Sequence, residues 1–243
     1  MSGGVLFQES LRVLSLSGLH EMAERDVLKA LDVAQAHGPL DLIYDCGLEA
    51  KLERQTLLTR GVAIFFSYAA GNLADDLADG DCTYLAEPAR TGPCVQFVLQ
   101  NLFFAAALRS GVSCAVLDEV ISTLARASGP QLIEVRTRQW TAELTRLVAE
   151  SIAGLQYAAY LRLLWDGTPL EARAREIGMS LGVANHVAKD LLTQDPRCAT
   201  LSPEHTAEVV AWAREHAETL RREGLACLEA TLRHVDPILA HAS

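Results

Sequence analysis

The chain has 243 residues, half of them apolar, and carries a formal net charge of −10 at pH 7. A chain of this length and composition can bury a substantial core, which excludes a disordered protein. The acidic balance argues against nucleic acid as a partner, because binding to a phosphate backbone depends on clustered Lys and Arg.

The apolar runs and the cysteines indicate the cellular setting. The longest nearly uncharged apolar stretch, 61–74, is too short to span a bilayer, and the N-terminus lacks a basic region before its apolar part. The six cysteines form no C-x-x-C pair and no spacing typical of zinc, which fits reduced structural thiols. We therefore predict a cytoplasmic protein that does not span a membrane.

Apolar residues recur at three- and four-residue spacing along nearly the whole chain, which predicts an all-α protein. The predicted helices are, in chain order, 5–16, 19–36, 48–77, 94–110, 113–127, 131–165, 169–192, 203–222 and 224–239. Two are unusually long and apolar around much of their circumference, which indicates central helices in one large bundle. Since no repeat or linker composition marks a boundary, residues 1–243 are predicted to form a single domain.

Four carboxylates lie within seven residues near the end of the third predicted helix: Asp75, Asp76, Asp79 and Asp81. Asp75 and Asp79 are one helical turn apart on the same face, and Asp76 lies about 100° round. Like charges at this spacing repel, so a hard cation such as Mg²⁺ that bridges the carboxylates would explain them, with other positions left for water and phosphate oxygens. A solvated helix end is the alternative interpretation.

Residues 73–81, LADDLADGD, and the Arg-x-Gly that begins at Arg90 resemble the first aspartate-rich motif of the trans-prenyl diphosphate synthases. They also resemble the DD-x-x-D-E motif of squalene and phytoene synthases. Together with class I terpene cyclases, these families share an all-α isoprenoid synthase fold. The resemblance implies a single large helical bundle with a central apolar cavity. It also implies Asp75, Asp76 and Asp79 as catalytic residues and metal ligands, Mg²⁺ as cofactor, and Arg90 as a contact to the diphosphate.

A second stretch, GMSLGVANHVAKDLLT at 178–193, resembles the prenyl synthase pattern G-x-x-x-G-x-A-F-Q-x-x-D-D-x-x-D without a gap. Gly178 and Gly182 have a physical use, because small residues at four-residue spacing let a helix pack closely against its neighbour. That use would exist in any tight bundle. The order of the two motifs in an all-α background predicts the isoprenoid synthase fold.

The second motif departs from the family pattern at its charged positions. His186 stands at the usual Gln, and Lys189, Asp190 and Thr193 stand at the three aspartates. The resemblance leaves Asp190 as a metal ligand and Lys189 and His186 as substrate-binding residues. Lys189 could contact the diphosphate as a point charge, or pair with the first acidic cluster and occupy the place of the metal. His186 and Asp190, one turn apart, could equally form a simple hydrogen-bonded pair.

The resemblance implies Mg²⁺-dependent ionisation of an allylic prenyl diphosphate with loss of pyrophosphate. Metal ions and basic side chains stabilise the leaving group, and an apolar cavity shields the carbocation. Phe65 and Phe66 precede the first motif by two to three turns, where side-chain size limits product length in the family. They are predicted to bind the substrate and to make its pocket short.

The Gly-Gly-Lys-x-Arg segment that binds isopentenyl diphosphate in chain-elongating synthases has no counterpart before Lys51, Arg54 or Arg60. This favours an enzyme that ionises one diphosphate, with terpene-cyclase-like or prenyl-transfer chemistry as the outcome. The alternatives are a chain-elongating or head-to-head prenyl diphosphate synthase and a catalytically silent subunit that docks on an active synthase. A bundle whose acids are simply solvated is a further alternative.

A homodimer is possible, because the family often has one. The apolar face around Leu99, Phe103 and Ala107 could form its interface, although burial in the core of one chain would explain that face equally well.

Overall fold

The computed structural model describes residues 3–242, and every regular element in that range is a helix. The predicted all-α class is confirmed. Packing divides the chain into two compact units, Met1–Leu117 and Asp118–Ser243. The single domain predicted for residues 1–243 stays a prediction.

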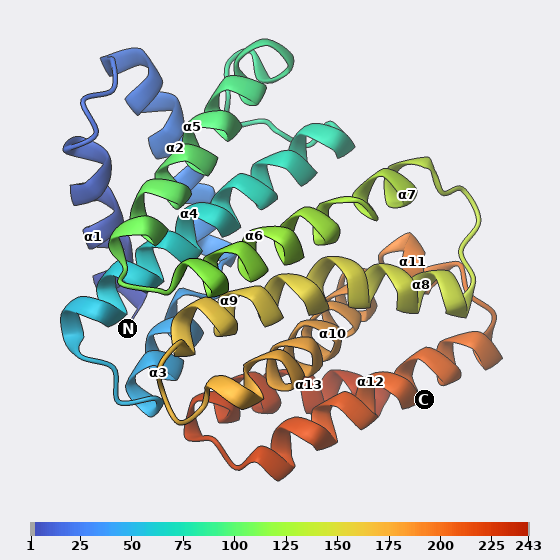
Figure 1. The fold of residues 1–243 in the computed structure, drawn as a ribbon. Coiled ribbons are helices and arrows are strands. Elements are labelled where there is room, and N and C mark those ends of the chain that lie inside the picture. Colours follow the sequence, from blue (N-terminus) through green and yellow to red (C-terminus); the bar gives the residue numbers. More distant parts are fainter. Residues whose placement is uncertain (1–2, 243) are drawn as a thin grey trace. The chain divides into compact units, whose positions relative to one another are not determined.

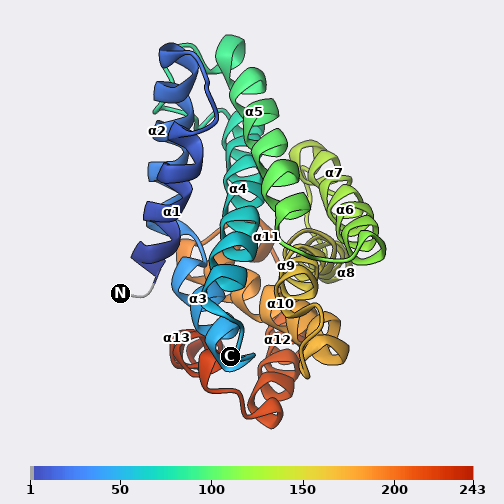
Figure 2. The ribbon, with the colours of Figure 1, turned by 60° about the vertical axis from the view of Figure 1, so that its left-hand side comes forward.

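The first unit is organised around one long apolar helix, α4 (Arg54–Asp79), which packs against four others. Figures 1 and 2 both show α5 running beside α4. The buried residues of α4 extend from Leu57 to Leu73 and are mostly apolar. The four surrounding helices are α1 (Gly3–Ser15), α2 (Glu21–His37), α3 (Leu40–Glu49) and α5 (Pro88–Arg109).

The helix predicted over 48–77 is wrong at its start. The chain instead completes α3 at Glu49, turns through Lys51 with a φ of 55°, and starts α4 at Arg54. A non-glycine residue in this left-handed region is uncommon, so propensity gave no sign of the turn. The end of α4 is two residues later than predicted, at Asp79, followed by Gly80 with a φ of 81°. Glycine at this position is a common helix stop.

Helix α6 (Cys114–Ser128) leads the chain into the second unit, whose central helix is α10 (Ala174–Thr193). Helix α10 packs against α8, α9, α12, α13 and the π-helical turn η1. The other helices of this unit are α7 (Gln131–Arg136), α8 (Ala142–Ala149), η1 (Glu150–Gly154), α9 (Leu155–Trp165), η2 (Glu171–Arg173), α11 (Pro196–Ala199), α12 (Pro203–Glu223), η3 (Ala226–Leu228) and α13 (Glu229–His241).

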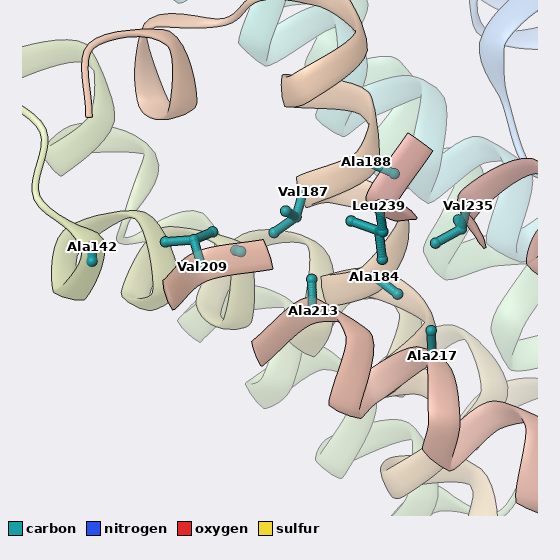
Figure 3. Close-up of a cluster of buried hydrophobic side chains, with 10 residues drawn as sticks. Ala142, Ala184, Val187, Ala188, Val209, Ala213, Ala217, Val235 and Leu239 are labelled. Carbon is teal, nitrogen blue, oxygen red and sulfur yellow. The ribbon is translucent and has the colours of Figure 1, made fainter. Parts of the chain in front are cut away.

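Small side chains make up one buried cluster in the second unit. Figure 3 shows Ala184, Val187 and Ala188 of α10 facing residues of α8, α12 and α13. Alanines at these contacts leave little side-chain volume between the helices, so the helix axes can approach closely. The facing residues in this cluster are Ala142, Ala149, Val209, Ala213, Ala217, Val235 and Leu239.

The helix predicted over 131–165 is also wrong, because the chain leaves the helix after Arg136 and starts again at Ala142. Thr141 caps the new start: its hydroxyl accepts a hydrogen bond from the backbone N–H of Leu144 at 3.2 Å. The helix then passes through the π turn η1 before it continues as α9. Two helical stretches, 131–136 and 142–165, therefore replace the one predicted helix.

Of the helices in the described range, α5 alone has the length and hydropathy of a membrane span. A core helix of a soluble protein passes the same test, and α5 packs along α4. The buried face of α5 includes Leu99, Phe103 and Ala107, so this face belongs to the core of one chain and is not a surface for a second copy.

Candidate functional site

The predicted acidic cluster lies at the C-terminal end of α4 and in the loop that follows. The carbonyl oxygen of Asp76 accepts hydrogen bonds from the backbone N–H groups of Gly80, Asp81 and Cys82. These bonds wrap the loop around the helix end. Asp75 and Asp76 are half-buried, whereas Asp79 is exposed. The four carboxylates therefore stand on a folded helix end and not on a frayed one.

Asp76 is held in place by two side chains. Its Oδ2 atom accepts hydrogen bonds from Asn72 Nδ2 at 3.1 Å and from the Tyr84 hydroxyl at 2.7 Å. Asn72 lies one turn earlier on α4, and Tyr84 comes from the loop. Burial, reinforced by Asp76, raises the pKa of Tyr84, so the phenol remains a hydrogen-bond donor at neutral pH. Sequence analysis missed both partners of Asp76.

A second phenol lies on the same side of α4. Burial raises the pKa of Tyr68 to about 12, and the charges of Asp76 and Asp75 add to the effect. The Tyr68 hydroxyl donates a hydrogen bond to the carbonyl oxygen of His37 at 3.2 Å. Burial is the main cause of both shifts, and the negative charges of Asp75 and Asp76 by themselves favour a cation at the end of α4.

Within residues 3–242, no three His, Cys, Asp or Glu side chains are placed to hold a metal ion by themselves. Mg²⁺ commonly needs fewer protein ligands than this, because it keeps several waters and is bound by one or two carboxylates together with substrate phosphates. Asp75 and Asp79, one turn apart on α4, fit this smaller donor set. The residues therefore fit a metal ion that is shared with a phosphate ligand.

Arg90 is exposed near the start of α5, where it forms an ion pair with Glu87 at 3.1 Å. Gly92, two residues later, is buried against Leu77 of α4, and a Cβ atom at Gly92 would overlap the Leu77 side chain. This close contact brings the beginning of α5 to the last turns of α4. The residue that contacts Leu77 is two positions after Arg90, and the role of Arg90 as a diphosphate contact stays a prediction.

Phe65 and Phe66 are fully buried in α4. The ring of Phe65 meets Phe7 of α1 edge to face, with centroids 6.1 Å apart. Phe65 thus packs in the core of the first unit, and its role as a substrate contact stays a prediction. A groove of about 800 Å³ in this unit is lined by α1, α4 and α5, including Gln55 and Thr59 near the start of α4. It lies at the opposite end of α4 from the aspartates.

The two glycines of the second motif do allow close packing. A Cβ atom at Gly178 would overlap the backbone of Ala158 in α9, and one at Gly182 would overlap the backbone of Ala153 in η1. The helix α10 therefore touches its neighbour backbone to backbone at both positions. This contact accounts for the glycine spacing without any role in binding.

Asp190 is the one acid that the second motif retains, and its side chain is 1% exposed. Arg197 binds both of its carboxylate oxygens: Nε lies 2.9 Å from Oδ2 and Nη2 lies 3.1 Å from Oδ1. This geometry does not support the predicted role of Asp190 as a metal ligand, because a guanidinium already occupies its oxygens. Sequence analysis missed Arg197, which lies beyond the end of α10 and outside the motif.

His186 Nε2 lies 3.5 Å from Asp190 Oδ2, close to the pair that the spacing had suggested. Burial, with the nearby charge of Lys189, lowers the pKa of His186 to about 4, so the imidazole is neutral at pH 7. Lys189 is exposed. The hydroxyl of Thr193 donates a hydrogen bond to the carbonyl oxygen of Lys189 at 2.9 Å. The substrate contacts of His186 and Lys189 stay predictions.

Compared by sequence, the chain matches no protein-family model and no curated protein. Compared by structure, it is similar over nearly its whole length to many solved proteins, including the following three. The first is a geranyltranstransferase from Thermotoga maritima, with a TM-score of 0.71 and 18% identity over 99% of this chain and 98% of that one. The second is a geranyltransferase from Legionella pneumophila, with a TM-score of 0.74 and 15% identity over 99% and 94%.

The third is an isoprenoid synthase family member from Thermotoga neapolitana, with a TM-score of 0.69 and 15% identity over 99% of this chain and 98% of that one. Likeness at such low identity shows the fold. The chain has the isoprenoid synthase fold, and the fold predicted from the two motifs is confirmed.

Proposed function

We propose that the chain binds a prenyl diphosphate at the C-terminal end of α4 and ionises it, with loss of pyrophosphate. The observation that carries this proposal is the fixed Asp76 carboxylate, held by Asn72 and Tyr84 between Asp75 and Asp79. The fold supports the same class of chemistry, since two of the similar structures are described as a geranyltranstransferase and a geranyltransferase.

The aspartates would bind the diphosphate through Mg²⁺, with Asp75 and Asp79 as the ligands from one face of α4. When bound, Mg²⁺ neutralises charge on the diphosphate and so makes pyrophosphate a better leaving group. Arg90, at the start of α5, would contact the diphosphate directly. Asn72 and Tyr84 keep Asp76 oriented, so the negative charge at the helix end is arranged before the substrate arrives.

In the reaction, the C–O bond between the allylic carbon and the diphosphate breaks, and its electron pair leaves with pyrophosphate. The allylic carbocation that remains must be kept away from water. The apolar residues of α4 that precede Asp75 supply such surroundings, and we place the prenyl chain along them. Attack by a second prenyl unit would give prenyl transfer, whereas internal attack would give a terpene-cyclase-like product.

Pyrophosphate release from the purified chain tests this proposal. C10, C15 and C20 allylic diphosphates are offered alone and then with isopentenyl diphosphate, with and without Mg²⁺. We expect Mg²⁺-dependent release that Asp75→Asn and Asp79→Asn reduce by at least about a hundredfold. Asp32→Asn, the same change at an exposed position of α2, is the matched control. Release that survives both substitutions would contradict the proposed site.

The same assay separates the alternatives. Release that requires isopentenyl diphosphate would identify chain elongation, and release from one allylic substrate alone would identify an ionising or head-to-head enzyme. The silent-subunit alternative has a specific observation in its favour, namely the guanidinium of Arg197 on Asp190. No release under any condition, together with co-purification of an active synthase, would establish that alternative.

Substrate length can be tested at Phe66. If this ring closes the prenyl pocket, Phe66→Ala should shift the preference from the shorter to the longer diphosphates. Leu48→Ala, at an exposed position of α3, is the control. An unchanged length preference in a folded Phe66→Ala protein would show that the ring serves packing alone.

We also propose a homodimer, formed through the exposed face of α5. Phe97 and Leu108 are 66% and 70% exposed, and Phe104 lies between them on the same side of the helix. Light scattering on the purified chain and on Leu108→Glu measures this. A dimer that Leu108→Glu converts to a monomer supports the proposal, and a monomeric unmodified chain contradicts it.

A further inference from the structure

Three carboxylates from three segments of the second unit converge on one guanidinium at the C-terminal end of α10. Asp190 receives two hydrogen bonds from Arg197, through Nε and Nη2. Asp195 Oδ2 accepts a third, from Nη2 at 3.0 Å. Glu134 of α7 forms an ion pair with Nη1 of Arg197. All three nitrogens of the guanidinium are therefore engaged by carboxylates.

This arrangement is buried and fixed from several sides. The side chain of Asp190 is 1% exposed and that of Arg197 is 11% exposed. The turn that carries Arg197 is tied back to α10, because the backbone N–H of Asp195 donates to the carbonyl oxygen of Asp190 at 2.9 Å. The Thr145 hydroxyl of α8 donates to the carbonyl oxygen of Arg197 at 2.7 Å. A planar guanidinium with paired carboxylates is the strong form of a charge-assisted contact.

We propose that Arg197 is the built-in cation of the second motif: it neutralises Asp190 in place of a metal ion, so the chain binds metal from the aspartates of α4 and not from α10. The part that concerns α4 rests on the function proposed above. The part that concerns Asp190 rests on the contacts of Arg197 alone.

The chemistry of the surroundings supports this assignment. A Mg²⁺ ion at Asp190 would have to displace the guanidinium from a carboxylate oxygen, and Arg197 would then lose two charge-assisted hydrogen bonds while it stays buried. The residue before Asp190 on α10 is Lys189, whose positive charge disfavours a second cation nearby. The hydroxyl of Thr193 is already donated to a backbone carbonyl. Arg197 therefore occupies the position in front of the Asp190 carboxylate that a metal ion would need.

Counting bound Mn²⁺ tests the proposal without any turnover. Free Mn²⁺ is measured by electron paramagnetic resonance as it is titrated into the full chain, with inorganic pyrophosphate present. We expect Asp190→Asn to bind as many Mn²⁺ ions as the unmodified chain, with a dissociation constant changed less than about twofold. Asp75→Asn should weaken Mn²⁺ binding by at least about tenfold. Loss of a Mn²⁺ ion in Asp190→Asn would overturn the proposal.

A measurement on the unmodified chain covers the case in which Asp190→Asn fails to fold. With pyrophosphate present throughout, addition of saturating Mn²⁺ should slow hydrogen exchange at residues 72–84 and leave it the same at residues 186–198. Slower exchange at 186–198 would overturn the proposal. If the unmodified chain bound no Mn²⁺ at all, the function proposed at α4 would fail while Arg197 would keep its role at Asp190, so the two failures are told apart.

Discussion

The phenol of Tyr84 donates a hydrogen bond to the carboxylate of Asp76, with the two oxygens 2.7 Å apart. Tyr84 belongs to the loop after α4, and its pKa is raised by burial and by Asp76 itself. The tyrosine therefore fixes the direction of the carboxylate without neutralising its charge. It is a positioning residue of the candidate site.

Removal of that hydroxyl should weaken the site without unfolding the chain. A hydrogen bond to a charged group contributes roughly 1.5–3 kcal/mol, so Tyr84→Phe should raise the Mg²⁺ concentration for half-maximal pyrophosphate release by about tenfold or more. The measurement is a Mg²⁺ titration of the release rate. Tyr44→Phe, the same change on α3, serves as the control and should leave the titration unchanged. An unaltered midpoint in Tyr84→Phe would show that Asp76 does not need this partner.

The backbone contact at Gly182 should make that position intolerant of any side chain. The Cβ atom of Gly182→Ala would overlap the backbone of Ala153, which cannot move aside as a flexible side chain can. Overpacking of this kind costs about 1–3 kcal/mol or more, so denaturant titration should show a clear loss of stability. Gly4→Ala is the contrasting change, because nothing lies within 4 Å of a Cβ there and Gly4 is helical. That substitution should stabilise the chain slightly.

Acid should weaken the packing of α10 against α12 at His216. Nδ1 of His216 lies 3.1 Å from the Ser180 hydroxyl, and the ring stands edge to face against Trp212. Burial lowers the pKa of His216, although Glu150 and Glu215 oppose the shift. Since the folded chain binds this proton less well than the unfolded chain, the free energy of unfolding should fall as pH drops below about 6.5.

Denaturant titrations at several pH values between 5 and 7.5 measure this effect. His216→Gln should reduce the pH dependence, and buried His186, whose pKa is lowered to about 4, should account for part of what remains. His205→Gln, at an exposed position of the same helix, should leave the pH dependence unchanged. Identical slopes for His216→Gln and the unmodified chain would show that another group carries the acid sensitivity.

The six cysteines should fall into two classes of reactivity. Cys94 and Cys114 are exposed, and the other four are buried. Burial, together with Asp190 and Asp195, raises the pKa of Cys198 to about 12, so almost none of it is thiolate at pH 8. Timed labelling with iodoacetamide and mass spectrometry should therefore modify Cys94 and Cys114 first. Early modification of Cys198 would mean that the turn around Arg197 opens readily.

Local signals in the sequence predicted some elements closely. The helix predicted over 203–222 corresponds to α12, which ends one residue later, because both of its ends carry readable signals. Ser202 accepts a hydrogen bond from the backbone N–H of His205, Pro203 occupies the first turn, and Gly224 follows the end. The placement of Asp75 and Asp79 on one face could also be predicted, because it depends on the geometry of a single helix.

Features that depend on distant contacts could not be predicted. Thr141 looks like any polar helix residue until the chain is seen to start a new helix there. Nothing in the motif around Asp190 indicates that Arg197, and not a metal ion, binds its oxygens, because Arg197 reaches it only through the turn after α10 and Glu134 of α7. The sequence pattern predicts which acids are present, whereas tertiary contacts decide what each acid binds.

The π turn at Glu150–Gly154 sets the rotational phase of everything that follows it in the same helical rod. A π-helical turn contains about one more residue than a turn of α-helix. One residue corresponds to about 100° of rotation around the helix axis. The extra residue in η1 therefore determines the direction in which the buried side of α9, with Tyr160 and Trp165, points. Deletion of a single residue from that turn would rotate α9 by about 100° and turn its aromatic side away from the core, although the sequence of α9 itself would be unchanged.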